Sequence, residues 1–137
     1  MADVYSPSKR SEVMRRVRGS NTKPEVAVRR LLHAMGYRFR LHRADLPGKP
    51  DIVLPGRQAA IFVHGCFWHG HPGCEAARRP ASNRAYWDRK LDGNIARDKR
   101  NRAALRRLGW RVLVLWECRL KSGLEARFRK FLAETPQ

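Results

Sequence analysis

The segment from residue 64 to residue 74 concentrates side chains that can do chemistry. Its sequence is HGCFWHGHPGC, and it holds three of the five histidines and two of the three cysteines of the chain. Thiolates and imidazoles are preferred ligands of Zn²⁺, and large aromatic side chains on a loop can stack on nucleic-acid bases. The segment therefore predicts a metal-built loop that presents aromatic side chains and spare imidazoles to a substrate.

Four residues have the donor types of a closed, structural zinc site. They are Cys66, His71, Cys74 and Cys118. The first three are close in sequence, and the fourth directly follows a predicted strand. Three thiolates and one imidazole complete a tetrahedral shell. His69 could replace His71 as the ligand, and Glu117 is a weaker alternative to Cys118. Three unrelated buried cysteines are the simpler interpretation, but the short spacing favours zinc.

Polar residues at the ends of two predicted strands indicate a second metal site. Asp51 opens one strand and His64 closes the next, so we expect them to meet at one edge of a sheet. Metal-dependent nucleases place carboxylates at such an edge, where a hard cation neutralises the charge developing on the phosphate. The second carboxylate of that arrangement is missing, since Phe62 occupies its place. A turn without catalytic meaning is the competing interpretation of Pro50-Asp51.

Histidine can supply the acid–base chemistry of such a site. If His71 binds zinc, His64 and His69 are both available. One can act as a general base on water, and the other can stabilise or protonate the leaving oxygen. Glu25 could reach the same cation through water molecules, although its capping-box spacing from Thr22 already explains a glutamate there.

Charge and aromatic residues both indicate a nucleic-acid partner. Lysine and arginine total 30 against 12 acidic residues, which gives a formal net charge of +18 and a pI near 11.4. Such a surface attracts polyanions, and no separate basic amphipathic segment favours a membrane surface. Phe67 and Trp68 are adjacent on the loop, where we expect them to stack on bases or wedge between them. Burial of one of the pair in the core is the alternative.

Targeting and redox features predict a cytosolic protein. The chain has no apolar run of about 18 residues that would span a membrane. Its N-terminus, MADVY, has no signal-peptide pattern. An odd number of cysteines fits a disulfide framework poorly, so reduced thiols free to bind metal fit better. We expect a cytosolic location.

Periodicity and turn residues predict seven elements between residue 22 and the end of the chain. A helix capped by Thr22 ends at Gly36, and strands follow at 37–41, 51–54 and 59–63. A long helix begins after Ser82 or Asn83 and runs to residue 108, with a break or bend at residues 92–94. The apolar strand 110–116 suits the middle of a sheet. Ser122 caps a final helix.

The predicted element order is α-β-β-β-α-β-α. It indicates an α/β fold in which a mixed central sheet is flanked by helices. Residues 1–20 form a basic N-terminal arm with a short helix at 8–17, and residues 21–137 form one domain.

Four sequence features together resemble one enzyme family. They are Pro50-Asp51, the run FVHGCFWH at 62–69, the later Trp87, and the strand WRVLVLWEC at 110–118. The chain resembles the very-short-patch-repair (Vsr-type) mismatch endonucleases over nearly its whole length. The run at 62–69 is the most specific of these features.

The resemblance implies a restriction-endonuclease-like fold with a structural zinc site. It also implies a magnesium-dependent enzyme that nicks one strand 5′ of the thymine in a T:G mismatch. Such mismatches arise when 5-methylcytosine deaminates, and the nick starts very short patch repair. Double-stranded DNA with a T:G mismatch would be the substrate, mismatch-repair proteins are possible partners, and the asymmetric substrate suggests a monomer.

The resemblance also assigns residue roles. Asp51 would bind magnesium through its carboxylate and Val63 through its main-chain carbonyl. His69 would be the general base, His64 a transition-state or leaving-group helper, and Glu25 a residue of the outer metal shell. The zinc ligands would be Cys66, His71, Cys74 and Cys118. The residues expected to contact DNA are Phe67, Trp68, Met14, Trp87, Lys90 and Asn94.

Two other classes of protein remain as alternatives. One is a sequence- or structure-specific nuclease of the same fold, which would cut matched duplex or branched DNA. The other is a non-catalytic, zinc-dependent DNA-binding module, in which replacing Asp51 would change nothing. The spare histidines argue against pure binding, which arginine would serve better.

Overall fold

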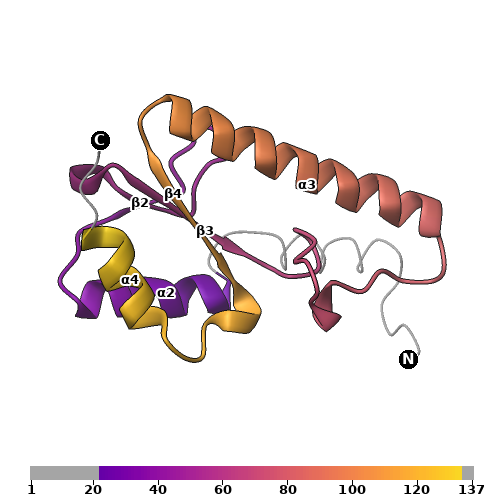
Figure 1. Ribbon diagram of the computed structural model, residues 1–137, viewed down its shortest axis with the longest axis horizontal. Coiled ribbons are helices and arrows are strands. Elements are labelled where there is room, and N and C mark those ends of the chain that lie inside the picture. The colour runs from indigo at the N-terminus through magenta and orange to yellow at the C-terminus, as the bar shows by residue number, and fades with distance from the viewer. Residues whose placement is uncertain (1–21, 134–137) are drawn as a thin grey trace.

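The computed structural model describes residues 22–133 as a mixed α/β domain (Figure 1). The predicted arm at 1–20 and Met14 lie outside the described residues. The helices are α2 (Lys23–Ala34), α3 (Arg84–Arg107) and α4 (Leu124–Ala133). The strands are β1 (Arg40–Leu41), β2 (Ile52–Leu54), β3 (Ala59–His64) and β4 (Arg111–Trp116), and short 3₁₀ helices lie at Pro55–Arg57, Glu75–Ala77 and Glu117–Arg119. Their order confirms the predicted α-β-β-β-α-β-α succession.

The four strands of the described residues form one sheet in the order β1-β2-β3-β4. β1 and β2 are antiparallel, as are β2 and β3, whereas β3 and β4 are parallel. A parallel pair needs a long crossover, and α3 provides it. Because β2 runs against β3, the start of β2 and the end of β3 lie at the same edge of the sheet.

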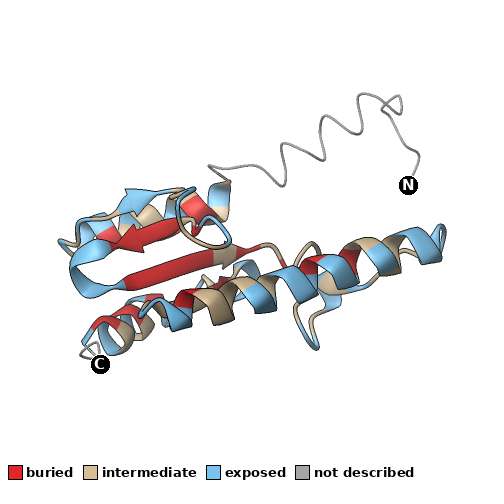
Figure 2. Ribbon diagram, turned by 90° about the horizontal axis from the view of Figure 1, so that it is seen from above, coloured by how far each residue is buried: buried red, intermediate tan, exposed pale blue. Residues whose placement is uncertain are grey.

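Helices cover both faces of the sheet. Figure 1 shows α2 and α4 together on one side and α3 on the other. The larger core joins residues such as Leu32 of α2, Ile61 of β3 and Phe128 of α4. Leu105 of α3 packs with Ala60 and Phe62 on the opposite face. Figure 2 shows the buried residues along the sheet between these layers. None of the helices within residues 22–133 is long and apolar enough to cross a membrane.

The first helix has both predicted end signals. Thr22 is the N-cap, and its side-chain oxygen accepts a hydrogen bond from Glu25 N at 3.4 Å. At the other end, Gly36 has φ +87°, and Tyr37 N donates to Leu32 O while Gly36 N donates to His33 O. These two bonds form a Schellman motif. They hold Tyr37 against the helix end, so the predicted strand 37–41 is wrong in its first part and β1 is only Arg40–Leu41.

Of the break or bend predicted at residues 92–94, the break is wrong, because α3 is continuous from Arg84 to Arg107; the bend stays a prediction. A single exposed glycine costs a helix only about 1 kcal/mol, which tertiary contacts can offset. Such contacts lie on both sides of Gly93: Asp92 pairs with Arg79, and the Asn94 amide donates to the main chain of Trp68.

The position of β4 differs from the prediction as well. Its apolar sequence suggested the middle of the sheet, but β4 is an edge strand that pairs with β3. Its side chains are apolar because helices cover both of its faces: Val112 and Val114 pack towards the α3 side, and Leu113 and Leu115 towards the α2–α4 side.

The start of the last helix also shifts. The carbonyl of Gly123 accepts the first hydrogen bond of α4, from Arg127 N at 3.1 Å. The cap position is therefore Gly123 rather than the predicted Ser122.

Candidate active site and metal centres

Three thiols and one imidazole converge where the loop after β3 meets the end of β4. Ligand atoms of Cys66, His71, Cys74 and Cys118 all lie within 4.8 Å of one another. Cys118 Sγ is 3.3 Å from His71 Nδ1. This donor set fits a closed tetrahedral zinc site.

Local turns bring these donors together. His71 N donates to Cys66 O at 3.0 Å, and Cys74 N donates to His71 O at 3.3 Å. The His71 ring stacks on Trp116, the last residue of β4, with centroids 4.3 Å apart. Burial raises the pKa of the Cys66 thiol to about 12. A thiol in this environment keeps its proton unless a metal replaces it.

The two alternative zinc ligands contact other groups. Glu117 Oε1 accepts a hydrogen bond from Cys66 N at 3.3 Å, so its carboxylate is engaged with the loop backbone. His69 Nδ1 lies 2.6 Å from Asp98 Oδ2 on α3. The structure thus groups His71, and not His69, with the three thiols.

Asp51 and the end of β3 meet at the predicted sheet edge. Asp51 Oδ2 accepts a hydrogen bond from Val63 N at 2.7 Å. Burial is the main reason why the pKa of Asp51 rises from 3.8 to about 6. The bond from Val63 opposes this rise, the negative charge of Glu25 adds to it, and the positive charges of His42 and His69 oppose it. A buried carboxylate of this kind is a common feature of functional sites.

Two stacked histidines lie beside this carboxylate. The rings of His64 and His69 are parallel within 3°, with centroids 3.8 Å apart. His64 is 3% exposed, and its Nδ1 has no hydrogen-bond partner within the described part of the chain. Burial, aided by the positive charge of His69, lowers the pKa of His64 to about 3. His64 is therefore a neutral imidazole at physiological pH.

A third group lies on the other side of Asp51. Glu25, from the first turn of α2, is 2% exposed, and its carboxylate contacts His42 Nε2. Ligand atoms of Glu25, His42 and Asp51 lie within 4.8 Å of one another. The capping box already explains why a glutamate stands at position 25. The structure shows that Glu25 also places a carboxylate next to Asp51.

Aromatic side chains cluster beside these polar groups. Phe67 packs edge-on against Trp68 and Trp87, with centroids 5.0 Å and 5.4 Å apart. Trp68 and Trp87 are 6.0 Å apart, and Tyr86, which is 55% exposed, packs against Trp87. Phe67, Trp68 and Trp87 are each half-buried. The loop after β3 and the first turn of α3 therefore build one aromatic cluster.

Comparison with known proteins establishes the family of this chain. The family described as "DNA mismatch endonuclease Vsr" matches residues 2–76. The Type II nicking enzyme V.XorIIP of Xanthomonas oryzae pv. oryzae is 56% identical over 134 residues, which cover 96% of this chain and 98% of that relative. The DNA mismatch endonuclease Vsr of Escherichia coli is 42% identical over 121 residues, which cover 88% and 77%. The chain belongs to the Vsr family.

Family membership identifies the chain as a DNA mismatch endonuclease, as its sequence predicted. A further relative, the Type II nicking enzyme V.NmeAIP of Neisseria meningitidis, is 43% identical over 129 residues. These residues cover 94% of this chain and 91% of that relative. The Vsr-family assignment and the nicking-enzyme relatives agree on cleavage of DNA.

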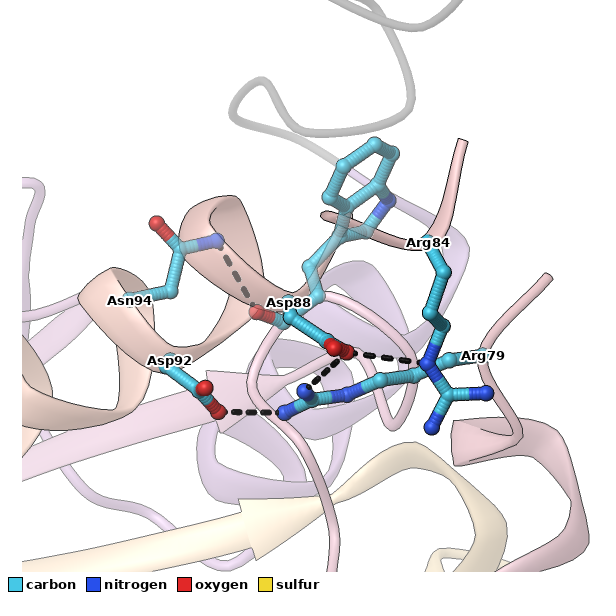
Figure 3. A network of polar contacts seen from close by, with 6 residues as sticks. Arg79, Arg84, Asp88, Asp92 and Asn94 are labelled. Atoms are coloured by element: carbon cyan, nitrogen blue, oxygen red, sulfur yellow. Dashed lines mark hydrogen bonds and ion pairs between the residues drawn. The ribbon is translucent and has the colours of Figure 1, made fainter. Parts of the chain in front are cut away.

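This Vsr-family protein has a polar network at the start of α3 that the sequence did not reveal. Figure 3 shows Arg79 between two carboxylates of α3. Its Nη1 lies 2.8 Å from Asp88 Oδ1 and its Nη2 lies 2.6 Å from Asp92 Oδ1. Arg84 Nε bonds to the same Asp88 oxygen at 3.0 Å. The pKa of Asp88 falls, chiefly because of the hydrogen bond from Arg79. This network fastens the end of the loop between β3 and α3 to α3.

Asn94 and Lys90 lie on the same helix. Asn94 is 6% exposed, and its Nδ2 donates to Trp68 O at 3.0 Å. In this state Asn94 holds the loop that carries Trp68. Lys90 is half-buried one turn before it. Their contacts with DNA stay predictions.

Sequence reasoning missed Asp98 and His42. Asp98 is one of several charged residues on α3, and no spacing rule connects it with His69. His42 follows Leu41, which pairs with Ile52, so the antiparallel pairing places residue 42 opposite Asp51. This placement follows only once the register of the two strands is known.

Proposed function

We propose that this Vsr-family endonuclease nicks one strand of duplex DNA 5′ of the thymine in a T:G mismatch. Deamination of 5-methylcytosine produces such mismatches, so the nick would begin very short patch repair. The observation that carries the proposal is one arrangement. Asp51, the paired His69 and Asp98, and the aromatic cluster all lie around the end of β3.

A magnesium ion fits the oxygen-rich side of this arrangement. We assign Asp51 and the main-chain carbonyl of Val63 as its ligands, with Glu25 acting through water. Buried carboxylates at a sheet edge are donors of the kind that Mg²⁺ accepts. When bound, the ion would neutralise charge on the phosphate and favour a deprotonated water.

The histidines divide the proton transfers between them. Because Asp98 accepts a hydrogen bond from Nδ1–H of His69, the lone pair of neutral His69 is on Nε2. His69 can therefore take a proton from the attacking water. The water oxygen bonds to phosphorus, the bond from phosphorus to the 3′ oxygen breaks, and the products are a 5′-phosphate and a 3′-hydroxyl. Neutral His64 is suited to donating a hydrogen bond to a developing oxyanion.

The aromatic cluster supplies the selection of the mismatch. A wobble pair is easier to unstack than a Watson–Crick pair, so wedging Phe67 and Trp68 into the duplex costs less there. Trp87, Lys90 and Asn94 would contact the mismatch and its flanks, and Met14 would join the wedge from the arm. The enzyme would act as a monomer on chromosomal DNA in the bacterial cytosol, beside mismatch-repair proteins.

A duplex with a single T:G pair tests the reaction. With Mg²⁺, we expect one nick 5′ of the thymine, and we expect none in the matched duplex. Asp51→Ala and His69→Ala should each abolish nicking while DNA binding, followed by fluorescence anisotropy, persists. Equal cutting of the matched duplex would favour a nuclease of different specificity. Binding without any cutting would favour a non-catalytic module.

We also propose that Cys66, His71, Cys74 and Cys118 bind a structural zinc ion. His71→Gln should lose zinc by elemental analysis and melt at a lower temperature, because the ion fixes a loop with little core of its own. His69→Gln is the matched control and should retain zinc. Zinc retained in His71→Gln but lost in His69→Gln would reverse the ligand assignment.

A further inference from the structure

We infer that His42, Glu25 and Asp51 form a single metal site in which His42 is a nitrogen ligand, and that this site prefers Mn²⁺ to Mg²⁺. The inference rests on the proposed function and deepens it: at the same sheet edge it adds His42 as a ligand and makes Glu25 a direct ligand in place of one that acts through water. The three residues come from the first turn of α2, the end of β1 and the start of β2. Their ligand atoms lie within 4.8 Å of one another.

The backbone holds His42 in an unusual conformation that directs it to this place. Its φ is +48°, in the left-handed region that residues other than glycine rarely adopt. Its N–H donates to Asp51 O at 3.1 Å, so the two main chains are joined at this point. Strained residues of this kind gather at functional sites, where neighbouring structure holds them in place.

The neighbouring carboxylates of Glu25 and Asp51 favour a bound cation. Glu25 is 2% exposed, and Asp51 beside it is half-buried. Two carboxylates this close repel each other and lose hydration, so a divalent ion between them offsets both costs. The imidazole of His42, whose side chain is 19% exposed, already contacts Glu25. An ion about 2.1 Å from each donor would keep opposite donors within about 4.2 Å of one another, so only a small inward adjustment is needed.

The donor set decides which ion is preferred. Mg²⁺ favours oxygen ligands and water in a strict octahedron, and imidazole is a poor ligand for it. First-row transition ions accept imidazole together with carboxylates. Two carboxylates and one imidazole therefore shift the preference towards Mn²⁺, which also carries the unpaired electrons needed to observe its ligands.

The test measures binding, separately from nicking. Zinc-loaded protein is titrated with Mn²⁺ by electron paramagnetic resonance, with Mg²⁺ as competitor, and spin-echo modulation reports a directly bound nitrogen. The test variant is His42→Asn, because asparagine tolerates positive φ. His42→Gln is the second variant, in case the first does not fold. The control is His33→Gln. His33 is an exposed histidine in the last turn of α2, the helix that also carries Glu25.

We expect the wild type to bind Mn²⁺ about tenfold or more tightly than Mg²⁺, and His42→Asn to lose most of that difference. Nitrogen modulation should vanish in His42→Asn and persist in His33→Gln. Unchanged Mn²⁺ affinity and modulation in both His42 variants would overturn the inference. Loss of the modulation in His69→Gln alone would overturn it too, because the ion would then lie with His64 and Asp98.

The outcome is independent of the mismatch assay. If Mn²⁺ binds through His42 and T:G duplexes stay uncut, the metal site stands and the proposed function fails. If T:G duplexes are nicked and the His42 variants bind Mn²⁺ like the wild type, the function stands and the role of His42 fails.

Discussion

Asp98 determines which nitrogen of His69 is available to a substrate. Its Oδ2 lies 2.6 Å from Nδ1 of His69, while the His64 ring stacks on the His69 ring. These two contacts fix both the tautomer and the orientation of His69, which are the properties that a general base requires.

Asp98→Asn should therefore slow nicking by a factor of about 10² to 10⁴, because an amide can stabilise the wrong tautomer and cannot stabilise an imidazolium. Single-turnover nicking of a T:G duplex measures the effect. The control is Asp45→Asn, which removes an exposed carboxylate paired with Arg43. A rate within about threefold of the wild type in Asp98→Asn would contradict the role.

Asp51 should make stability depend on pH in a predictable direction. Its pKa in the folded protein is about 6, above the ordinary value of 3.8. Between these values the folded state holds more protons than the unfolded state, so the free energy of unfolding falls as pH rises through this window.

Asp51→Asn should remove this fall in the free energy of unfolding with rising pH. In magnesium-free buffer, the variant should gain about 1 to 3 kcal/mol over the wild type as pH rises from about 4 to about 7, measured by urea unfolding. Asp45→Asn, at an exposed site, should show no such gain. A difference that stays constant with pH would mean that Asp51 is not desolvated in solution.

Much of the site could be predicted at this scale because strand ends carry positional information. Once Asp51 opens one strand and His64 closes its antiparallel neighbour, geometry brings them to one edge. Asp98 could not be predicted, since its approach to His69 depends on how α3 crosses the sheet. His42 depends on the length of the β1–β2 hairpin, which alternation at residues 37–41 alone does not determine.

At the scale of elements, α3 is more continuous than its sequence indicated. Its 24 residues run unbroken over Gly93, and Arg79 and Asn94 join it to the loop of the aromatic cluster. Long-range contacts like these lie outside any local sequence signal. The helix ends, in contrast, were predictable because Thr22, Gly36 and Gly109 act through neighbouring residues.

Gly93→Ala should stabilise the protein by about 0.5 to 1 kcal/mol, because alanine is the better helix former. A Cβ atom at this position would meet nothing within 4 Å. Urea unfolding at constant pH measures the change. Gly109→Ala is the matched comparison: the Cβ is equally unobstructed, but φ is +91°, so the variant should lose about 1 kcal/mol. Destabilisation by Gly93→Ala would indicate a bend at residues 92–94.

At the scale of the whole molecule, charge and apolar burial are separated. Within residues 22–133 the core is made of the sheet and three helices, and none of its buried residues is a lysine or an arginine. The mixed α/β class followed from the order of periodic segments. The edge position of β4 did not, because an edge strand covered by helices on both faces has the same composition as a central one.

DNA affinity should fall steeply with salt. With a net charge of +18 and several phosphate contacts, binding should weaken by about 10³-fold between about 50 and 200 mM salt. Anisotropy titrations with matched and T:G duplexes should give parallel slopes, since phosphates carry no sequence information. Phe67→Ala should weaken only mismatch binding and leave the slope unchanged. A shallow slope would contradict phosphate-dominated binding.

The parallel pairing of β3 with β4 also governs when the site can form during synthesis. Asp51, His64 and His69 leave the ribosome early, but contacts such as that between Cys66 N and Glu117 Oε1 span 51 residues. Closing so long a segment is slow and must await β4. The nascent chain therefore carries its reactive histidines and thiols for the time needed to make α3, and the nuclease becomes competent only after residue 118 has been added.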